Sequence, residues 1–220
     1  MIPVAPAAPL VDFSLYLITD QGATKGRELL TVVEEALAGG VRGVQLREKG
    51  LSPRDACELA QELRLLTSRY GSRLLINDRV DIALAVGADG VHLPESALPV
   101  VVARELLGPS RLIGVSCHSP QGALEAQRQG ADFVTLGPLY ATPSKARYGA
   151  PLGISPLVEA LGSLSIPLFA LGGITLERLP ELQAAGLHRI ALISAILSAR
   201  APKAEADAFI RLLQRSAPSS

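Results

Sequence analysis

The 220-residue sequence has little cysteine, few aromatic residues and no excess of either charge. Its two cysteines, Cys57 and Cys117, are too few for a disulfide framework, so a reduced, cytoplasmic setting is expected. Lys plus Arg and Asp plus Glu number 21 each, and this balance argues against nucleic acid or an acidic membrane as a partner. No apolar run is long enough to cross a bilayer.

What the chain does contain is the composition of a globular domain, with 48% hydrophobic residues. The first ten residues, MIPVAPAAPL, are rich in Pro and Ala and lack the basic start of a signal peptide. We therefore expect a flexible arm over residues 1–12, one domain over 13–215 and a frayed tail over 216–220. The oligomeric state stays open, with a homo-oligomer as one option.

Short apolar runs alternate with segments of helical spacing eight times. The expected strands are 14–20, 42–49, 73–78, 89–93, 111–117, 132–138, 166–173 and 188–194. Most are continuously apolar, as in a parallel sheet that is buried on both faces. Eight such units predict an α/β fold with a single (β/α)8 TIM barrel. An open doubly wound sheet is the alternative, but no G-x-G-x-x-G follows the first strand.

Catalytic groups of such barrels lie at the carboxyl ends of the strands, and polar residues concentrate there in this sequence. Gln45, Arg47 and Lys49 alternate with other residues at the end of the second strand, so they share one face. Two cations and an amide on an inward face predict a phosphate or diphosphate site. The alternative is an ion-pair network with inward carboxylates.

Asn77 and Asp78 end the third strand and allow two interpretations. Both residue types are common helix N-caps, so they could begin the next helix. Asp78 could also bind Mg²⁺, which takes one or two carboxylates together with substrate phosphate oxygens.

The fifth strand ends in Ser116, Cys117 and His118. Ser116 and His118 share a face while Cys117 points the other way, so a Cys–His nucleophile pair is not expected. His118 is a candidate acid or base, or a histidine that is only hydrogen-bonded at the rim.

A long connection over residues 139–153 follows the sixth strand, where loops often act as lids. Its Thr142, Ser144 and Lys145 offer two hydroxyls and a cation to an anionic substrate, although an ordinary solvated loop is the alternative. Gly172 and Gly173 follow the seventh strand and Ser194 follows the eighth, the usual place for a phosphate cradle in this fold. The rim therefore predicts a diphosphate site and a separate monophosphate site.

Eight segments of the chain resemble the thiamin phosphate synthase family in the same order. They are YLITD, VQLREK, LINDRVDIAL, GVHL, IGVSCHS, GADFVTLGPLYATPSK, PLFALGGIT and IALISAI. The resemblance covers roughly residues 14 to 200 and is specific as a combination. It implies an enzyme that transfers a hydroxymethylpyrimidine group from its diphosphate to a thiazole phosphate and releases pyrophosphate.

The resemblance also assigns roles to residues. Asp78 would bind Mg²⁺, and pyrophosphate would be held by Gln45, Arg47, Lys49, Asn77 and Lys145. Ser116 and Thr142 would contact substrate, and Gly173, Ile193 and Ser194 would hold the thiazole phosphate. The pattern at the rim adds Ser144 to the first site and Gly172 to the second, and the candidate catalytic residues are Arg47, Lys145 and His118. Cations and metal would stabilise charge on the leaving group.

One segment, GVHLPESALP at 90–99, departs from the family pattern H-[LIV]-G-Q-x-D. Ala97 stands where the second Mg²⁺ aspartate is expected, and Pro94 replaces a glycine. Glu95 is then the alternative second carboxylate. A sister branch, the thiazole tautomerases, resembles this barrel, needs no metal and uses a histidine at the position of His118. A phosphate-binding barrel without catalysis is a third hypothesis. Each of the three implies small phosphorylated ligands.

Overall fold

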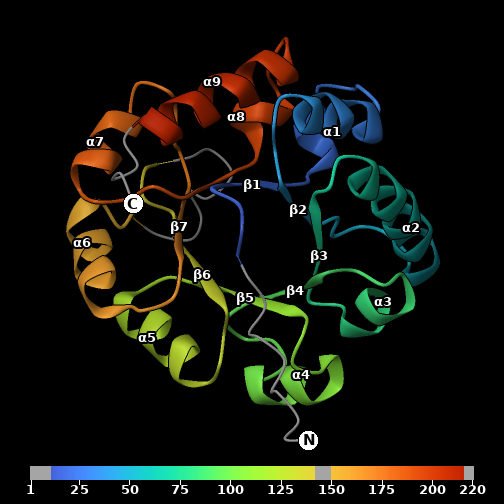
Figure 1. Ribbon diagram of the computed structural model, residues 1–220, viewed down its shortest axis with the longest axis horizontal. Coiled ribbons are helices and arrows are strands. Elements are labelled where there is room, and N and C mark those ends of the chain that lie inside the picture. Colours follow the sequence, from blue (N-terminus) through green and yellow to red (C-terminus); the bar gives the residue numbers. More distant parts are fainter. Residues whose placement is uncertain (1–10, 142–149, 216–220) are drawn as a thin grey trace, which may run out of the picture.

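The structure is a computed structural model that describes residues 11–141 and 150–215. Most of the expected arm, the centre of the 139–153 loop and the expected tail lie outside the described residues. Eight parallel strands close into a barrel in chain order, with β1 paired to both β2 and β8. Figure 1 looks down this barrel and shows the helices as a ring around it. The predicted TIM barrel is confirmed.

Each strand is shorter than the apolar run that predicted it. The strands are β1 Leu15–Ile18, β2 Gly43–Leu46, β3 Arg73–Asn77, β4 Gly90–Leu93, β5 Leu112–Cys117, β6 Phe133–Leu136, β7 Leu168–Leu171 and β8 Ile190–Leu192. The polar residues after these ends, such as Arg47 and His118, have left the ladder of backbone hydrogen bonds. They are therefore free to line the rim instead of pairing with neighbouring strands.

The helices follow the expected alternation. They are η1 Gln21–Thr24, α1 Leu29–Ala38, α2 Pro53–Arg69, α3 Val80–Ala85, α4 Val100–Leu107, α5 Pro120–Arg128, α6 Ile154–Ser163, α7 Leu179–Ala184, α8 Ser194–Leu197 and α9 Pro202–Arg215. The Ser52 and Ser119 hydroxyls accept backbone N–H groups at the starts of α2 and α5, as caps do. Helix α7 begins four residues later than Thr175, where the apolar spacing begins.

Aromatic rings fill the lower interior of the barrel. Phe13, Phe133 and Phe169 pack with centroid distances of 5.2 to 5.9 Å, and Tyr16 joins them at 5.4 to 5.9 Å. Gly114 is required here, because a Cβ at this position would lie 2.3 Å from the Phe133 ring. These rings pack the interior beneath the carboxyl ends of the strands, the end of the barrel where ligands bind in this fold.

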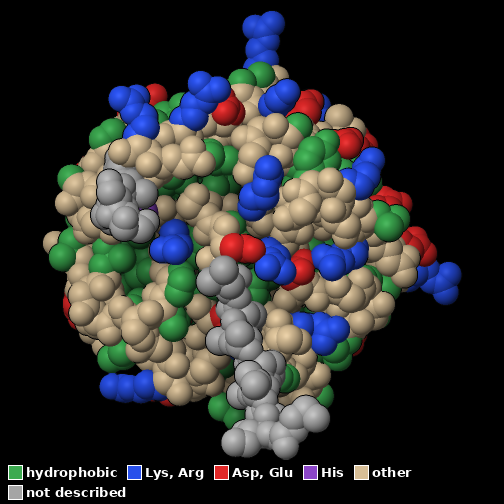
Figure 2. Space-filling view, in the orientation of Figure 1, with side chains coloured by type: hydrophobic (Ala, Val, Ile, Leu, Met, Phe, Trp, Pro, Cys, Tyr) green, Lys and Arg blue, Asp and Glu red, His purple; other side chains and the backbone are tan. Residues whose placement is uncertain are grey.

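The surface is mixed in charge. On the face shown in Figure 2, Lys and Arg side chains lie among Asp and Glu side chains and form no field of a single sign. Within the described residues, no helix is both long enough and apolar enough to span a bilayer.

Candidate active site

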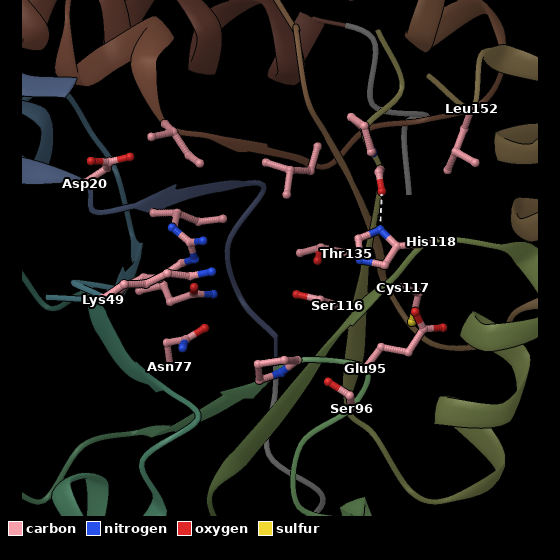
Figure 3. Close-up of a pocket in the computed structure, with 18 of the residues that line it drawn as sticks. Asp20, Lys49, Asn77, Glu95, Ser96, Ser116, Cys117, His118, Thr135 and Leu152 are labelled. Atoms are coloured by element: carbon pink, nitrogen blue, oxygen red, sulfur yellow. Dashed lines mark hydrogen bonds between the residues drawn. The ribbon is translucent and has the colours of Figure 1, made fainter. Parts of the chain in front are cut away.

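A cavity of about 890 Å³ opens at the carboxyl ends of the strands, and residues at or beyond the ends of all eight strands contribute to its wall. The wall includes the polar or titratable residues Asp20, Gln45, Arg47, Lys49, Asn77, Glu95, Ser116, Cys117, His118 and Thr135, and the apolar Ile193. In Figure 3, Asp20, Lys49 and Asn77 lie on one side of this pocket, and Ser116, Thr135 and His118 lie across from them.

The structure brings Gln45, Arg47 and Lys49 together on the pocket wall. Gln45 is 1% exposed, and its Nε2 donates to the Tyr16 hydroxyl at 3.1 Å. Neither Arg47 nor Lys49 forms an ion pair with any described carboxylate, and the segments outside the description contain no Asp or Glu. The alternative of an inward ion-pair network is therefore wrong, and this wall can attract an anion.

The corner after β3 separates Asn77 from Asp78. Asn77 lines the pocket, whereas Asp78 is exposed, does not line it, and has a left-handed φ of 65°. The N-cap of α3 is Arg79, which makes no side-chain cap bond. Hence neither Asn77 nor Asp78 caps this helix, and that interpretation of the pair is wrong.

Glu95 lines the pocket near the start of α5. A Cβ added at Gly122 would lie 2.5 Å from its Oε1, and Figure 3 shows Glu95 beside Cys117 and across from Asn77. Burial, and secondly the Glu95 charge, raise the pKa of the Cys117 thiol to about 12, so this cysteine stays protonated at neutral pH.

Of the two carboxylates considered for a metal, Glu95 lines the pocket and Asp78 does not. Within residues 11–141 and 150–215, no cluster of three or more His, Cys, Asp or Glu side chains is arranged to hold a metal. One carboxylate with substrate phosphate oxygens is still a donor set that Mg²⁺ accepts.

His118 stands at the rim with one ring nitrogen engaged. Its Nδ1 lies 2.7 Å from the Gly137 carbonyl oxygen, the contact drawn as a dashed line in Figure 3. Because a carbonyl can only accept, Nδ1 carries the proton in the neutral ring and Nε2 remains as an acceptor. This contact supports His118 as a proton acceptor in the pocket.

The glycine turn after β7 lies at the edge of the pocket, because Leu171 and Ile193 line it while the turn itself does not. Gly172 and Gly173 have left-handed φ angles of 102° and 67°, and a Cβ on Gly173 would lie 2.7 Å from the Tyr140 side chain. Ser194 is exposed at the first residue of α8, and Ile193 precedes it.

Thr142, Ser144 and Lys145 lie outside the described residues, so their predicted roles remain predictions. Thr135 is a pocket residue that the sequence interpretation missed, although it is the one polar side chain in the apolar strand β6. A single polar residue at an inward position of a buried strand was the signal.

Residues 15–196 match the family model described as thiamine monophosphate synthase. A Geobacter sulfurreducens protein, described provisionally as a thiamine-phosphate synthase, is 61% identical over 203 residues, which is 92% of this chain and 95% of that protein. A Clostridium novyi thiamine-phosphate synthase is 44% identical over 85% of this chain and 92% of its own length.

Solved structures agree with this match. The thiamine phosphate pyrophosphorylase from Pyrococcus furiosus is similar with a TM-score of 0.84 at 35% identity, over 93% of this chain and 97% of that one. A 3-hexulose-6-phosphate synthase reaches a TM-score of 0.67 at 20% identity, covering 90% of this chain and 99% of that one, and supports the barrel fold alone.

Proposed function

The chain belongs to the thiamine monophosphate synthase family, and we propose that its pocket joins a hydroxymethylpyrimidine diphosphate to a thiazole phosphate. The carbon–oxygen bond to the diphosphate breaks, and pyrophosphate leaves with the electron pair. The thiazole ring nitrogen then forms the new carbon–nitrogen bond. The products are thiamin phosphate and pyrophosphate, so the chain is an enzyme of thiamin biosynthesis that acts on small phosphorylated substrates.

The unpaired cations on the pocket wall are the observation that carries this proposal. Arg47 and Lys49 face a cavity with no described acidic partner, and Asn77 adds an amide beside them. Charge that develops on a departing diphosphate is stabilised by fixed cations that need no rearrangement. Gln45 and Ser116 complete the proposed set of described contacts, and Lys145, Thr142 and Ser144 are proposed to add to it from the loop.

Asp78 is the residue that we propose holds Mg²⁺, together with oxygens of the diphosphate. The metal, when bound, would neutralise part of the leaving group's charge. Asp78 directly follows the pocket-lining Asn77, but its own side chain is exposed and does not line the cavity, so the metal would enter with the diphosphate at the edge of the pocket. Glu95 lies against Gly122 at the start of α5, and we do not propose it as a metal ligand.

The second phosphate is assigned to the turns after β7 and β8. Gly172 and Gly173 keep Cβ atoms out of this corner, and Ile193 lines the pocket next to Ser194. Backbone N–H groups and a serine hydroxyl are suited to a monophosphate. The thiazole nitrogen would then face the pyrimidine carbon from the opposite end of the cavity.

The direct test is formation of thiamin phosphate by purified protein from the two substrates. Product is expected only when both substrates and Mg²⁺ are present, and excess EDTA should abolish it. Arg47→Gln should lower kcat/KM by about 100-fold, because one fixed cation on the leaving group is lost. Arg54→Gln, a change at an exposed arginine on α2, should leave the rate unchanged and serves as the matched control.

A second assay on the same purified protein distinguishes a thiazole tautomerase from a synthase. Metal-independent isomerisation of a thiazole carboxylate phosphate, without thiamin phosphate formation, would overturn the proposal. Binding of thiazole phosphate without turnover in either assay would instead indicate a barrel that only binds ligands. The names of the relatives favour the synthase over both.

A further inference from the structure

A buried histidine lies directly beneath the pocket floor. His92, on β4, is 1% exposed, and its ring lies 5.6 Å from the Tyr16 ring and 5.6 Å from the Phe133 ring, centroid to centroid. Burial, and secondly the Arg47 charge, lower the pKa of its imidazole to about 3. His92 is therefore neutral near pH 7, and a neutral imidazole carries one proton on one of two nitrogens.

The two nitrogens of His92 have different surroundings. Nε2 lies 3.0 Å from the Ser116 hydroxyl oxygen and 3.4 Å from the Thr135 hydroxyl oxygen. Nδ1 is buried and has no hydrogen-bond partner among the described residues. It faces Gly114, where a Cβ would lie 2.6 Å from it, so the neighbouring strand offers this nitrogen no side-chain group.

These surroundings select the tautomer. A proton on Nδ1 would bury a donor with no acceptor, and buried N–H groups without partners are rarer in proteins than acceptors without partners. A proton on Nε2 instead allows a hydrogen bond to a hydroxyl that is within reach. The neutral ring therefore carries its proton on Nε2 and donates it to Ser116.

We propose that His92 is a positioning residue that makes the Ser116 hydroxyl a hydrogen-bond donor into the pocket. Because Ser116 accepts from His92, its own proton is directed elsewhere, and Ser116 lines the cavity across from Lys49. The opposite tautomer would turn the Ser116 proton toward His92 and present only lone pairs to an anionic substrate. This inference rests on the proposed function, in which Ser116 contacts the pyrimidine diphosphate.

Two histidines of opposite tautomer then act on the pocket, His118 in its wall and His92 beneath its floor. His118 carries its proton on Nδ1, which donates to the Gly137 carbonyl, and presents an acceptor. His92 carries its proton on Nε2 and, through Ser116, presents a donor. One wall of the cavity thus offers both a donor and an acceptor of hydrogen bonds at fixed places.

Long-range ¹H–¹⁵N correlation spectra of the wild-type protein test the tautomers directly. The chain has three histidines, so His92→Gln and His118→Asn spectra are sufficient to assign the signals. We expect the Nε2–H form for His92 and the Nδ1–H form for His118. An Nδ1–H signal for His92 would overturn the proposal whether or not the protein makes thiamin phosphate.

Kinetics test the path through Ser116. Ser116→Ala should lower kcat by about 100-fold, as loss of one well-placed donor does. His92→Asn, whose shorter amide does not reach Ser116, should lower kcat in the wild-type background but by less than about twofold in the Ser116→Ala background, since residues that act as a unit are not additive. His92→Gln, which can place an amide N–H near the Nε2 position, should restore most of the rate.

Losses that multiply independently in the double variant would show that His92 acts by some other route and would overturn the proposal. The KM for thiazole phosphate should be unchanged in all variants, whereas a general loss of structure would raise it. Thr135→Val removes the more distant hydroxyl and should change kcat little. If His92→Asn fails to fold, the spectra of the wild-type protein still decide the question. An inactive wild-type protein would count against the proposed function alone.

Discussion

At the amino-terminal end of the barrel, arginine and aspartate side chains are paired, whereas at the carboxyl end Arg47 and Lys49 face the pocket without a described acidic partner. Asp132, just before β6, accepts from Ile113 N at 2.6 Å and from Arg104 at 2.7 Å. Asp89, just before β4, repeats the arrangement with the Leu74 backbone N–H and Arg64.

The difference separates stability from function within one barrel. Carboxylates at the amino-terminal end are largely covered and are satisfied by backbone and guanidinium donors, so their removal would leave buried polar groups without partners. Arg47 and Lys49 at the carboxyl end line the pocket and form no ion pair with a described carboxylate. The first set therefore stabilises the fold, and the second set is the one that we propose binds diphosphate.

The largest expected effect comes from giving the cations at the carboxyl end an acidic partner. Lys49→Glu would place a carboxylate beside Arg47, pair that cation and repel the diphosphate. We expect kcat/KM to fall by roughly 1,000-fold, against about 100-fold for Lys49→Met, which only removes a charge. Steady-state kinetics measure the loss of activity, and thermal melting shows whether stability changes as well. Equal losses of kcat/KM in the two variants would show that an acidic partner for Arg47 has no effect beyond the loss of the Lys49 charge.

The second test breaks a pair at the amino-terminal end. Asp132→Ala should lower the free energy of unfolding by about 2 kcal/mol, because the Ile113 N–H and the Arg104 guanidinium lose their acceptor. Urea unfolding gives the change. The KM values of the folded variant should stay within about twofold of wild type, since the proposed substrate contacts all lie at the carboxyl end. A large change in KM with unchanged stability would reverse the assignment of the two ends.

A third test measures how the stability of the fold depends on pH, because His92, buried beneath the pocket, is neutral in the folded protein. The pKa of this imidazole is lowered to about 3, by burial first and by Arg47 second, whereas an unfolded histidine titrates near 6.5. Between these values the unfolded chain binds a proton that the folded chain does not. The free energy of unfolding should therefore fall as the pH drops below about 6.5, by up to about 1.4 kcal/mol per pH unit from this group.

Urea unfolding between pH 7 and pH 4 measures this slope, and His92→Gln is the control. The variant should unfold with a shallower pH dependence over the same range. An identical slope in the two proteins would mean that other groups dominate acid unfolding.

The smallest effect is expected from an exposed pair of the same chemical type. Asp207 and Arg211 on α9 lie 2.9 Å apart, with side chains 46% and 73% exposed. Asp207→Asn should change the free energy of unfolding by only about 0.3 kcal/mol, because water screens the pair. A loss as large as that of Asp132→Ala would show that burial is not the cause of the difference between pairs.

Much of this architecture is predictable from local patterns. Eight apolar runs separated by helical spacing predict the barrel, and Ser52 and Ser119 mark two helix starts correctly. The alternation of Gln45, Arg47 and Lys49 predicts that all three line one wall, which the structure places as expected. The alternative that Asn77 or Asp78 caps the next helix is wrong, and local patterns give no sign that Glu95 lies against Gly122 at the start of α5.

The sequence alone determined the alternation of elements, the end of the barrel that carries polar groups and the family, because these depend on spacing along the chain. Only the tertiary structure decided that Arg47 and Lys49 lack acidic partners and that Asp132 is paired with Arg104. It also decided that His92 contacts Ser116 with one nitrogen and nothing with the other. Those facts depend on which strands become neighbours when the barrel closes, and no local pattern contains that information.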